Sequence, residues 1–212
     1  MREPSQAERL HDRAAAYLRP LADSLSLSDT VYAQLVAAYE EPHRRYHSLE
    51  HIVEMLDCLT QSRHVAKDPD AVALAIWFHD CVYDSHADHG ENERLSALRL
   101  AELHAEAPSP AAQAMILHSA HHDASDDPDT QLFCDIDLYR LGVDFATFQQ
   151  HGRNVRAEYD WIDDATWASG RSTFMQRFLD RPAIYQTDYW RDRLEKQARK
   201  NLTRMIAPSK KS

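Results

Sequence analysis

The hydrophobic positions along the chain recur mostly at the spacing of helices. Alanine, leucine, arginine and glutamate, which are good helix formers, fill the long segments. Only four glycines occur, and alternating runs rich in valine and isoleucine are scarce, so strands and hairpins have little support. The polar, turn-rich segment between His122 and Cys134 predicts a loop. The pattern predicts an all-α fold, a helical bundle, with helices near residues 5–22, 28–40, 48–61, 69–80, 91–106, 109–122, 134–140, 144–160, 166–179 and 188–206.

Local signals sharpen several of these helices. Asp68-Pro69 and Ser109-Pro110 predict helix starts, because Asp and Ser side chains cap free N–H groups and proline is tolerated in the first turn. The apolar face predicted for the helix over 91–106 consists of Leu95, Leu98 and Leu103.

Length and composition suit one globular domain, expected over residues 1–207, with a flexible tail over 208–212. The chain has 212 residues, enough to bury a core without disulfides or a structural metal. A formal net charge of −10 disfavours binding to nucleic-acid backbones. No segment has the roughly 18 uncharged apolar residues of a membrane span, and no signal peptide is visible at the N-terminus. We therefore expect no membrane partner and a cytoplasmic location, while a homodimer stays open.

The three cysteines, Cys58, Cys81 and Cys134, lie far apart in apolar helical contexts. They fit no zinc or redox motif, so we expect them to be small buried thiols.

Candidate chemistry begins with an adjacent histidine and aspartate, His79 and Asp80, at the end of an apolar segment that starts at Ala75. An aspartate beside tryptophan and phenylalanine is rare unless it is paired or binds a metal. The alternative is a helix that ends at the surface with both side chains solvated. Upstream, His47 and His51 are four residues apart, so on a helix they share one face. Both could reach one metal ion, one could bind it while the other faces a substrate, or both could be incidental at an exposed helix start.

Two aspartates, Asp135 and Asp137, stand further on between apolar residues. Burying a carboxylate without a partner costs several kcal/mol, so each is expected to have one. One could cap a helix while the other binds a ligand, and capping or a supporting role is the preferred interpretation of Asp135.

Four motifs follow one another: Tyr-His-x-x-x-His from residue 46, Ala-x-Trp-Phe-His-Asp-x-Val-Tyr from residue 75, Asn-Glu-x-x-Ser-Ala from residue 92 and Asp-x-Asp-Leu-x-x-Leu-Gly from residue 135. In this order they resemble the HD superfamily of metal-dependent phosphohydrolases, and most closely a bacterial family of predicted HD phosphohydrolases. The resemblance runs from about residue 30 to 206. It implies a single HD-type helical domain with a metal-binding core over about 30–145 and additional C-terminal helices over about 146–207.

The resemblance also implies a ligand set, His51, His79, Asp80 and Asp137, for one divalent ion. Such mixed nitrogen and oxygen ligands suit Mn, Fe, Co, Ni or Zn, and Mg is included among the candidates. In distant relatives with a similar Tyr-His element the second histidine binds the metal and the first protonates the leaving oxygen, which makes His47 the candidate acid. The implied reaction is hydrolysis of a small phosphorylated, nucleotide-like metabolite by metal-activated water.

Glu93 is the candidate to position or deprotonate the attacking water, although it could equally be a solvated surface side chain. Ser96 lies three residues further on and shares its helix face. Ser96 and Asp135 are expected to support the site from behind the ligands.

Phosphate oxygens are best held by arginines, whose planar donors bind them in pairs. The candidates are Arg44, Arg45, Arg156 and Arg171. The family pattern favours Arg156 and Arg171, and structural ion pairs are the alternative for each. His122 is expected to line the pocket without being a primary ligand, although His118 and His122 together could serve a second metal.

The chain lacks the His-Asp-Ile-Gly-Lys continuation of many HD phosphohydrolases, so a lysine-assisted mechanism is not expected at this point. Two rival functions stay open. The first is an HD-fold di-iron oxygenase, which two irons with additional histidine ligands would favour. The second is a non-catalytic, metal-binding regulatory module, which is disfavoured because all four implied ligands are residue types that coordinate metals.

Overall fold

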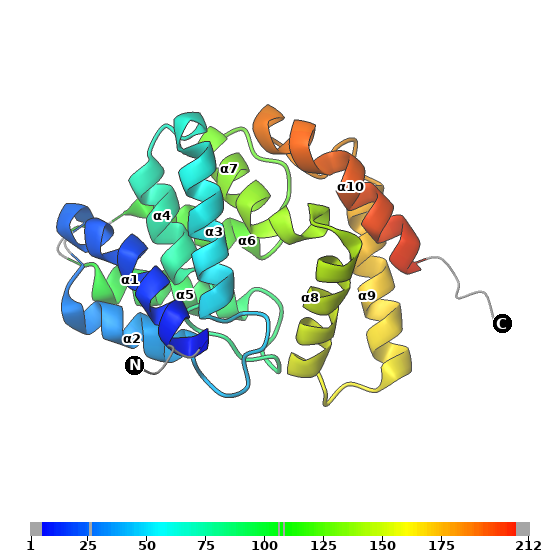
Figure 1. The fold of residues 1–212 in the computed structure, drawn as a ribbon, viewed down its shortest axis with the longest axis horizontal. Helices are drawn as coiled ribbons and strands as arrows, with labels where there is room; N and C mark the ends of the chain where they lie inside the picture. The colour runs from blue at the N-terminus through cyan, green and yellow to red at the C-terminus, as the bar shows by residue number, and fades with distance from the viewer. Residues whose placement is uncertain (1–5, 26, 106, 108, 207–212) are drawn as a thin grey trace, which may run out of the picture. The chain divides into compact units, whose positions relative to one another are not determined.

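The computed structural model describes residues 6–25, 27–105, 107 and 109–206, so the tail predicted over 208–212 lies outside the described residues. Within these ranges the protein consists of helices and loops without a strand, which confirms the all-α prediction (Figure 1). The α-helices are α1 (Gln6–Leu25), α2 (Asp29–Tyr39), α3 (Leu49–Ser62), α4 (Pro69–Phe78), α5 (Glu91–Leu103), α6 (Pro110–Ser119), α7 (Pro128–Asp137), α8 (Phe145–Glu158), α9 (Asp164–Leu179) and α10 (Asp188–Ile206). Two 3-10 helices are η1 (Arg63–Val65) and η2 (Leu138–Gly142).

The predicted helix starts at α4 and α6 are confirmed by their caps. Asp68 accepts a hydrogen bond from the backbone N–H of Ala71 at 3.0 Å, and Ser109 accepts one from Ala112 at 3.3 Å. In both helices proline occupies the first turn, where its missing N–H costs no intrahelical bond.

The loop predicted between His122 and Cys134 is wrong in its second half, because α7 begins at Pro128. Asp127 accepts hydrogen bonds from both the backbone N–H and the hydroxyl of Thr130, at 2.8 and 2.7 Å. This is the same Asp-Pro start signal as in α4. The many turn-forming residues around it led to the prediction of a loop over the whole segment.

The chain divides into two compact units, Met1–Cys134 and Asp135–Ser212. In the first unit α4 is the central helix, packed against α1, α3, α5 and α6. Residues 71–78 of α4 are all buried, as expected for a helix that is apolar on every side. The hydroxyl of Tyr39 donates to the carbonyl of Trp77 at 3.0 Å and satisfies one of the last carbonyls of α4. The two residues that follow this helix are therefore held inside the unit.

The face of α5 that packs inward differs from the predicted leucine face. Ser96, Ala97 and Leu100 are the buried residues of α5, whereas Leu98 is 48% exposed. α5 packs against α6, and the small side chains of Ser96 and Ala97 lie on its buried face. The spacing of the leucines predicted one buried face, whereas the face that is buried is the neighbouring one, which carries the small residues Ser96 and Ala97.

In the second unit α10 packs against α9 and η2, and α8 also packs against η2. The approach of η2 to α10 depends on Gly142, since a Cβ atom there would lie 2.6 Å from the Cβ of Leu194 and 2.9 Å from the hydroxyl of Tyr185. The side-chain amide of Asn201 donates to the carbonyls of both residues that flank Gly142, at 2.8 Å each.

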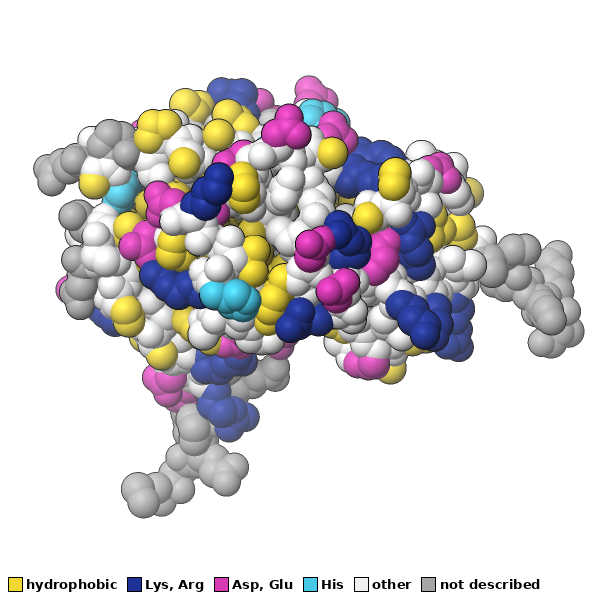
Figure 2. Space-filling view, turned by 90° about the horizontal axis from the view of Figure 1, so that it is seen from above, with side chains coloured by type: hydrophobic (Ala, Val, Ile, Leu, Met, Phe, Trp, Pro, Cys, Tyr) yellow, Lys and Arg dark blue, Asp and Glu magenta, His cyan; other side chains and the backbone are white. Residues whose placement is uncertain are grey.

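The cysteines, the hydropathy of the helices and the surface charges can be compared with the expectations from the sequence. All three cysteines are free and buried, as predicted. Within the described ranges no helix combines the length and hydropathy needed to cross a membrane. Acidic and basic side chains are interspersed on the face shown in Figure 2, in a chain whose net charge is −10.

Candidate metal centre

The first turn of α3 and the two residues that follow α4, all in the first unit, supply the side chains of the candidate site. α3 begins at Leu49, after Ser48 at the N-cap position, and carries His51 in its first turn. α4 ends at Phe78, and His79 and Asp80 follow directly, with the N–H of His79 still donating to the carbonyl of Ala75 at 2.9 Å.

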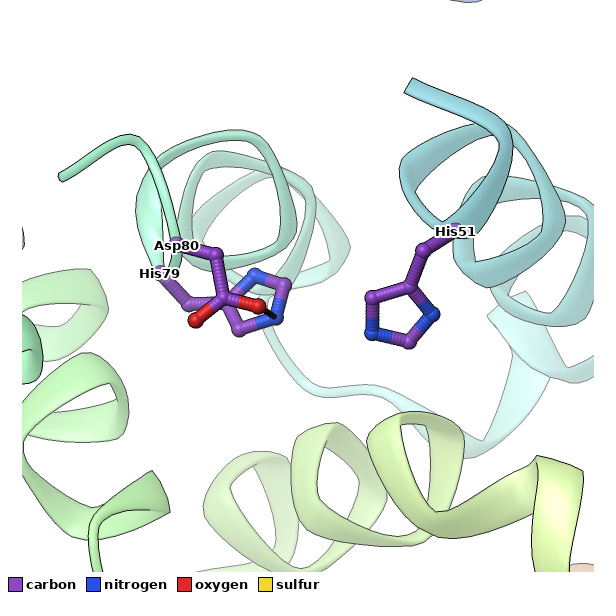
Figure 3. Close-up of side chains that lie close together, drawn as sticks. All are labelled: His51, His79 and Asp80. Carbon is purple, nitrogen blue, oxygen red and sulfur yellow. Dashed lines mark ion pairs between the residues drawn. The ribbon is translucent and has the colours of Figure 1, made fainter. Parts of the chain in front are cut away.

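His51, His79 and Asp80 come together in the interior. One potential ligand atom from each lies within 4.8 Å of the other two. The rings of His51 and His79 have centroids 5.6 Å apart and meet edge to face, and Figure 3 shows the His51 ring directed toward the other two side chains. Exposure is 1% for His51, 2% for His79 and 9% for Asp80, so this polar group is almost entirely removed from water.

The hydrogen bonds of His79 fix which of its nitrogens faces the cluster. Nδ1 lies 2.9 Å from the carbonyl oxygen of Ile76, and because that oxygen can only accept, Nδ1 carries the hydrogen. Nε2 then lies 3.0 Å from a carboxylate oxygen of Asp80 (Figure 3). A lone pair and a carboxylate at this distance repel unless a positive charge lies between them. A proton on Nε2 or a cation bound near both atoms supplies that charge.

The donor set fits a divalent metal ion. Two imidazoles and a carboxylate are the mixed ligands preferred by first-row transition metals, and a carbonyl bonded to the second ring nitrogen is the usual support for a metal-binding histidine. The ring of Phe133, 5.8 Å from that of His79 and edge to face with it, provides an apolar wall. Three of the four predicted ligands therefore lie together as a metal site requires.

The fourth predicted ligand, Asp137, is the last residue of α7 and belongs to the second unit. Its side chain is half-buried. Its place in the ligand set stays a prediction.

His47 does not share a helix with His51, so the argument from their spacing on one helix face is wrong. The helix starts only at Leu49, because Ser48 takes the N-cap position. His47 is instead held by aromatic contacts: its ring centroid lies 4.2 Å from that of Tyr83 and 4.9 Å from that of Tyr46. Tyr46 also contacts His51, at 5.2 Å between centroids, so the same ring touches both His47 and a candidate ligand.

Ser96 bonds the segment that follows Asp80, while its predicted role in supporting a metal site stays a prediction. Its hydroxyl accepts from the N–H of Val82 at 3.1 Å and donates to the carbonyl of the same residue at 3.3 Å. Asn92, four residues earlier on α5, makes the same reciprocal pair with Asp84, at 3.0 Å in both directions. Asn92 was not singled out in the sequence, although its i, i+4 relation to Ser96 in one motif was a usable signal.

Glu93 lies between these two anchors and is half-buried. It stands three residues before Ser96 and four before Ala97, on the side of α5 that packs inward. It is not a member of the group of three ligands. Cys81 is buried beside Ser96, and burial raises the pKa of its thiol to about 11, so it is a neutral packing group and no nucleophile.

The histidines near the end of α6 have other partners. Nε2 of His118 lies 2.9 Å from the carbonyl oxygen of Asp123 and donates to it, which makes that atom unsuited to a second metal. His121 pairs with His89, at 3.2 Å between ring nitrogens. His122 is half-buried with a positive φ of 48°, a conformation that ends the helix.

Asp135 acts as a cap within the second unit. Its completely buried carboxylate accepts from the N–H groups of Gln186 and Thr187, both at 2.7 Å, and from the hydroxyl of Thr187 at 2.6 Å. That hydroxyl in turn accepts from the N–H of Trp190 at 3.4 Å, at the start of α10. Burial raises the pKa of Asp135 to about 6, because the loss of hydration outweighs these hydrogen bonds.

Arg156 and Arg171, the favoured phosphate-binding arginines, lie on α8 and α9 of the second unit. Arg156 donates to the carbonyl of Ile162 at 2.9 Å and to the carboxylate of Asp164 at 2.8 Å, which ties down the loop between these helices. Arg171 lies over the ring of Phe174, at 4.9 Å. Arg156 therefore makes a structural ion pair, the alternative to phosphate binding that was stated for it.

No protein-family model, no curated protein and no solved structure matches this chain. Membership of the HD superfamily therefore stays a prediction from the four motifs.

Proposed function

We propose that the protein is a metal-dependent phosphohydrolase that acts on a small, nucleotide-like phosphate ester. The observation that carries the proposal is the buried group of His51, from α3, and His79 and Asp80, which follow α4. Removing two imidazoles and a carboxylate from water costs free energy, and coordination of a metal ion would offset that cost. The four motifs that resemble HD phosphohydrolases supply the reaction class.

In this proposal Asp137 completes the ligand set. A divalent ion, when bound, lowers the pKa of a coordinated water toward about 7 and polarises the phosphoryl group. Glu93 accepts a proton from the attacking water, and its half-buried place beside the anchored segment 82–84 supports this role. His47 donates a proton to the leaving oxygen, and its aromatic contacts with Tyr46 and Tyr83 hold the ring in a fixed orientation for that transfer.

The substrate is held by groups that match phosphate and a polar leaving group. We propose His122 and Arg171 for the phosphate oxygens. Arg156 is the weaker candidate of the two arginines, because its guanidinium already serves the loop before α9.

The experiment measures metal content and turnover on the same samples. The chain is stripped with a chelator and reconstituted separately with Mn, Fe, Co, Ni, Zn and Mg. Hydrolysis of an aryl phosphate and then of a panel of nucleoside monophosphates is followed. His79→Ala and Asp80→Ala should lose both the ion and the activity. Glu93→Gln and His47→Ala should keep the ion and turn over at least about a hundredfold more slowly, the size of a general acid–base contribution.

A matched control is His64→Ala, which removes an exposed histidine from η1 without touching the site. It should retain both metal and activity. Metallated protein that hydrolyses no phosphate ester but consumes oxygen when loaded with two irons would replace this proposal by the oxygenase. Metal binding without either activity would favour the regulatory module.

A further inference from the structure

Arg44 is the most deeply buried positive charge beside the candidate metal centre. Its side chain is 1% exposed, although it lies in the connection between α2 and α3 rather than within a helix. A guanidinium out of water costs several kcal/mol unless nearly all its donors are satisfied. The hydrogen-bond partners of the guanidinium therefore indicate the role of Arg44.

The donors of Arg44 mainly reach backbone carbonyls of the candidate site. Nη1 donates to the carbonyl of Asp80 at 2.6 Å and to that of His47 at 3.1 Å. Nη2 lies 3.4 Å from the carbonyl of Cys81. Its one carboxylate partner is Glu41, at 2.9 Å from Nε, whose own side chain is 45% exposed.

Two aromatic rings complete the surroundings. The guanidinium lies 5.3 Å from the ring centroid of Tyr39 and 5.4 Å from that of Tyr83, distances at which a cation is attracted to a ring face. Tyr83 contacts His47 in turn, and Tyr39 holds the carbonyl of Trp77 at the end of α4. Arg44 thus meets the segment before α3 and the segment after α4 in the same place.

We infer that Arg44 is the positioning residue of the metal centre. It fixes the backbone of Asp80, a ligand, relative to that of His47, the acid. The carbonyls after α4 lie beyond the last helical hydrogen bonds and need donors from elsewhere. One planar guanidinium can bond two of them and a third from the opposite segment in fixed directions, whereas a lysine offers one flexible point charge. This replaces the expectation that Arg44 holds phosphate, since its donors are engaged by three carbonyls and by Glu41.

The inference rests on the metal site of the proposed function but not on the reaction. It is therefore tested by binding of Co²⁺ to the full chain, measured by competition with a chromophoric chelator and by the visible absorption bands of the bound ion. Arg44→Met should weaken cobalt binding about 10- to 100-fold, as the loss of a group that orients ligands does, and should alter the bands. Arg44→Lys should recover less than half of the lost binding free energy, because the carbonyl pair needs the planar fork.

A stability-matched control separates positioning from general damage. Leu18→Ala, in α1, removes a completely buried side chain that belongs to no ligand-bearing element, and should lower the midpoint of urea unfolding at least as much as Arg44→Met does. It should leave the cobalt affinity and the bands unchanged while all variants remain folded by circular dichroism.

Each outcome decides the inference. The inference is overturned if Arg44→Met binds cobalt as tightly as Leu18→Ala does. Should Arg44→Met fail to fold, the same comparison is made with Arg44→Lys. Wild-type protein that binds no cobalt would overturn both this inference and the proposed function. Cobalt binding that depends on Arg44, in a protein without phosphatase activity, would support the positioning role and remove only the proposed reaction.

Discussion

Asp135 offers the sharpest test of how burial sets the value of a cap. Asp135→Ala removes the acceptor of two backbone N–H groups and one hydroxyl, all inside the second unit. The hydroxyl of Thr187 can rotate and the N–H of Gln186 is only partly buried, but the buried N–H of Thr187 is left without a partner. A buried donor without a partner costs about 1–3 kcal/mol and the partly buried N–H adds a smaller cost, which gives about 2–4 kcal/mol in total.

Asp144 provides a matched control on the surface. At the N-cap of α8 it accepts from the N–H groups of Ala146 and Thr147, at 3.0 and 3.1 Å, and from the hydroxyl of Thr147 at 2.5 Å. The three donor types are the same as at Asp135, but Asp144 is exposed, so water can replace it. Asp144→Ala should cost about 0.5–2 kcal/mol.

Urea unfolding followed by circular dichroism measures the total cost, and hydrogen exchange of the amides of residues 186–190 measures it locally. Asp135→Ala should lose at least about 1 kcal/mol more than Asp144→Ala and should lose protection at these amides. Equal losses in the two variants, or unchanged exchange at residues 186–190, would refute the reasoning that burial decides the size of the effect.

The pKa of Asp135 adds a dependence on pH whose sign is fixed. In the folded chain this pKa is about 6, above the ordinary value of 3.8, so between these values the folded state binds more protons than the unfolded state. The stability that Asp135 contributes is therefore fully present below about pH 4 and is lost as the pH rises toward 6. The difference in unfolding free energy between wild type and Asp135→Asn should shift against the wild type by up to about 1.4 kcal/mol per pH unit in this window. A difference that is flat with pH, measured in chelator, would contradict this.

Three further predictions concern matched pairs and the fourth ligand. Gly142→Ala should destabilise the protein by about 1–3 kcal/mol, because the added Cβ overpacks against α10. In Gly152→Ala the added Cβ meets nothing within 4 Å, so this variant should stabilise α8 by about 0.5–1 kcal/mol, and thermal unfolding measures both changes. Ser96→Ala should lower the unfolding free energy by about 1–3 kcal/mol because Ser96 is completely buried and its bonds are partly buried. Asn92→Ala, whose bonds are exposed, should lower it by no more than about 1 kcal/mol, and the reverse order of the two losses would contradict this account. Asp137→Asn should weaken cobalt binding at least about tenfold, and unchanged affinity in the chelator competition would remove Asp137 from the ligand set.

Most of the fold follows from helix propensity and from cap residues. The starts at Pro69 and Pro110 were predicted because a single polar side chain before proline decides them locally. The start at Pro128 was missed although the same signal is present, since surrounding turn formers outweighed it. The inward face of α5 was also missed, because the choice between a leucine face and a face of small residues depends on how closely α6 approaches.

Of the candidate ligands, His79 and Asp80 could be predicted because their residue types are out of place at the end of an apolar helix, whereas His51 was predicted from the resemblance to HD proteins. A histidine or aspartate among tryptophan and phenylalanine requires a partner, and that requirement is visible in the sequence alone. The setting of His47 was not visible in the same way. Its spacing from His51 suggested one helix, but Ser48 between them is a better N-cap than helix interior, and the helix starts after it.

The residues that hold the segment after α4 bond its backbone rather than its side chains, so the sequence does not show which backbone group each of them meets. Arg44 bonds the carbonyl of Asp80, Ser96 bonds both polar groups of Val82, and Asn92 does the same for Asp84. Every buried carbonyl or N–H needs a partner of this kind, so the sequence cannot say which arginine or serine meets which one. Because the segment that carries His79 and Asp80 is held in this way from two directions, grafting the ligand side chains alone onto another helical bundle should not reproduce the metal centre. The bonds to residues 80–84 would have to be transferred with them.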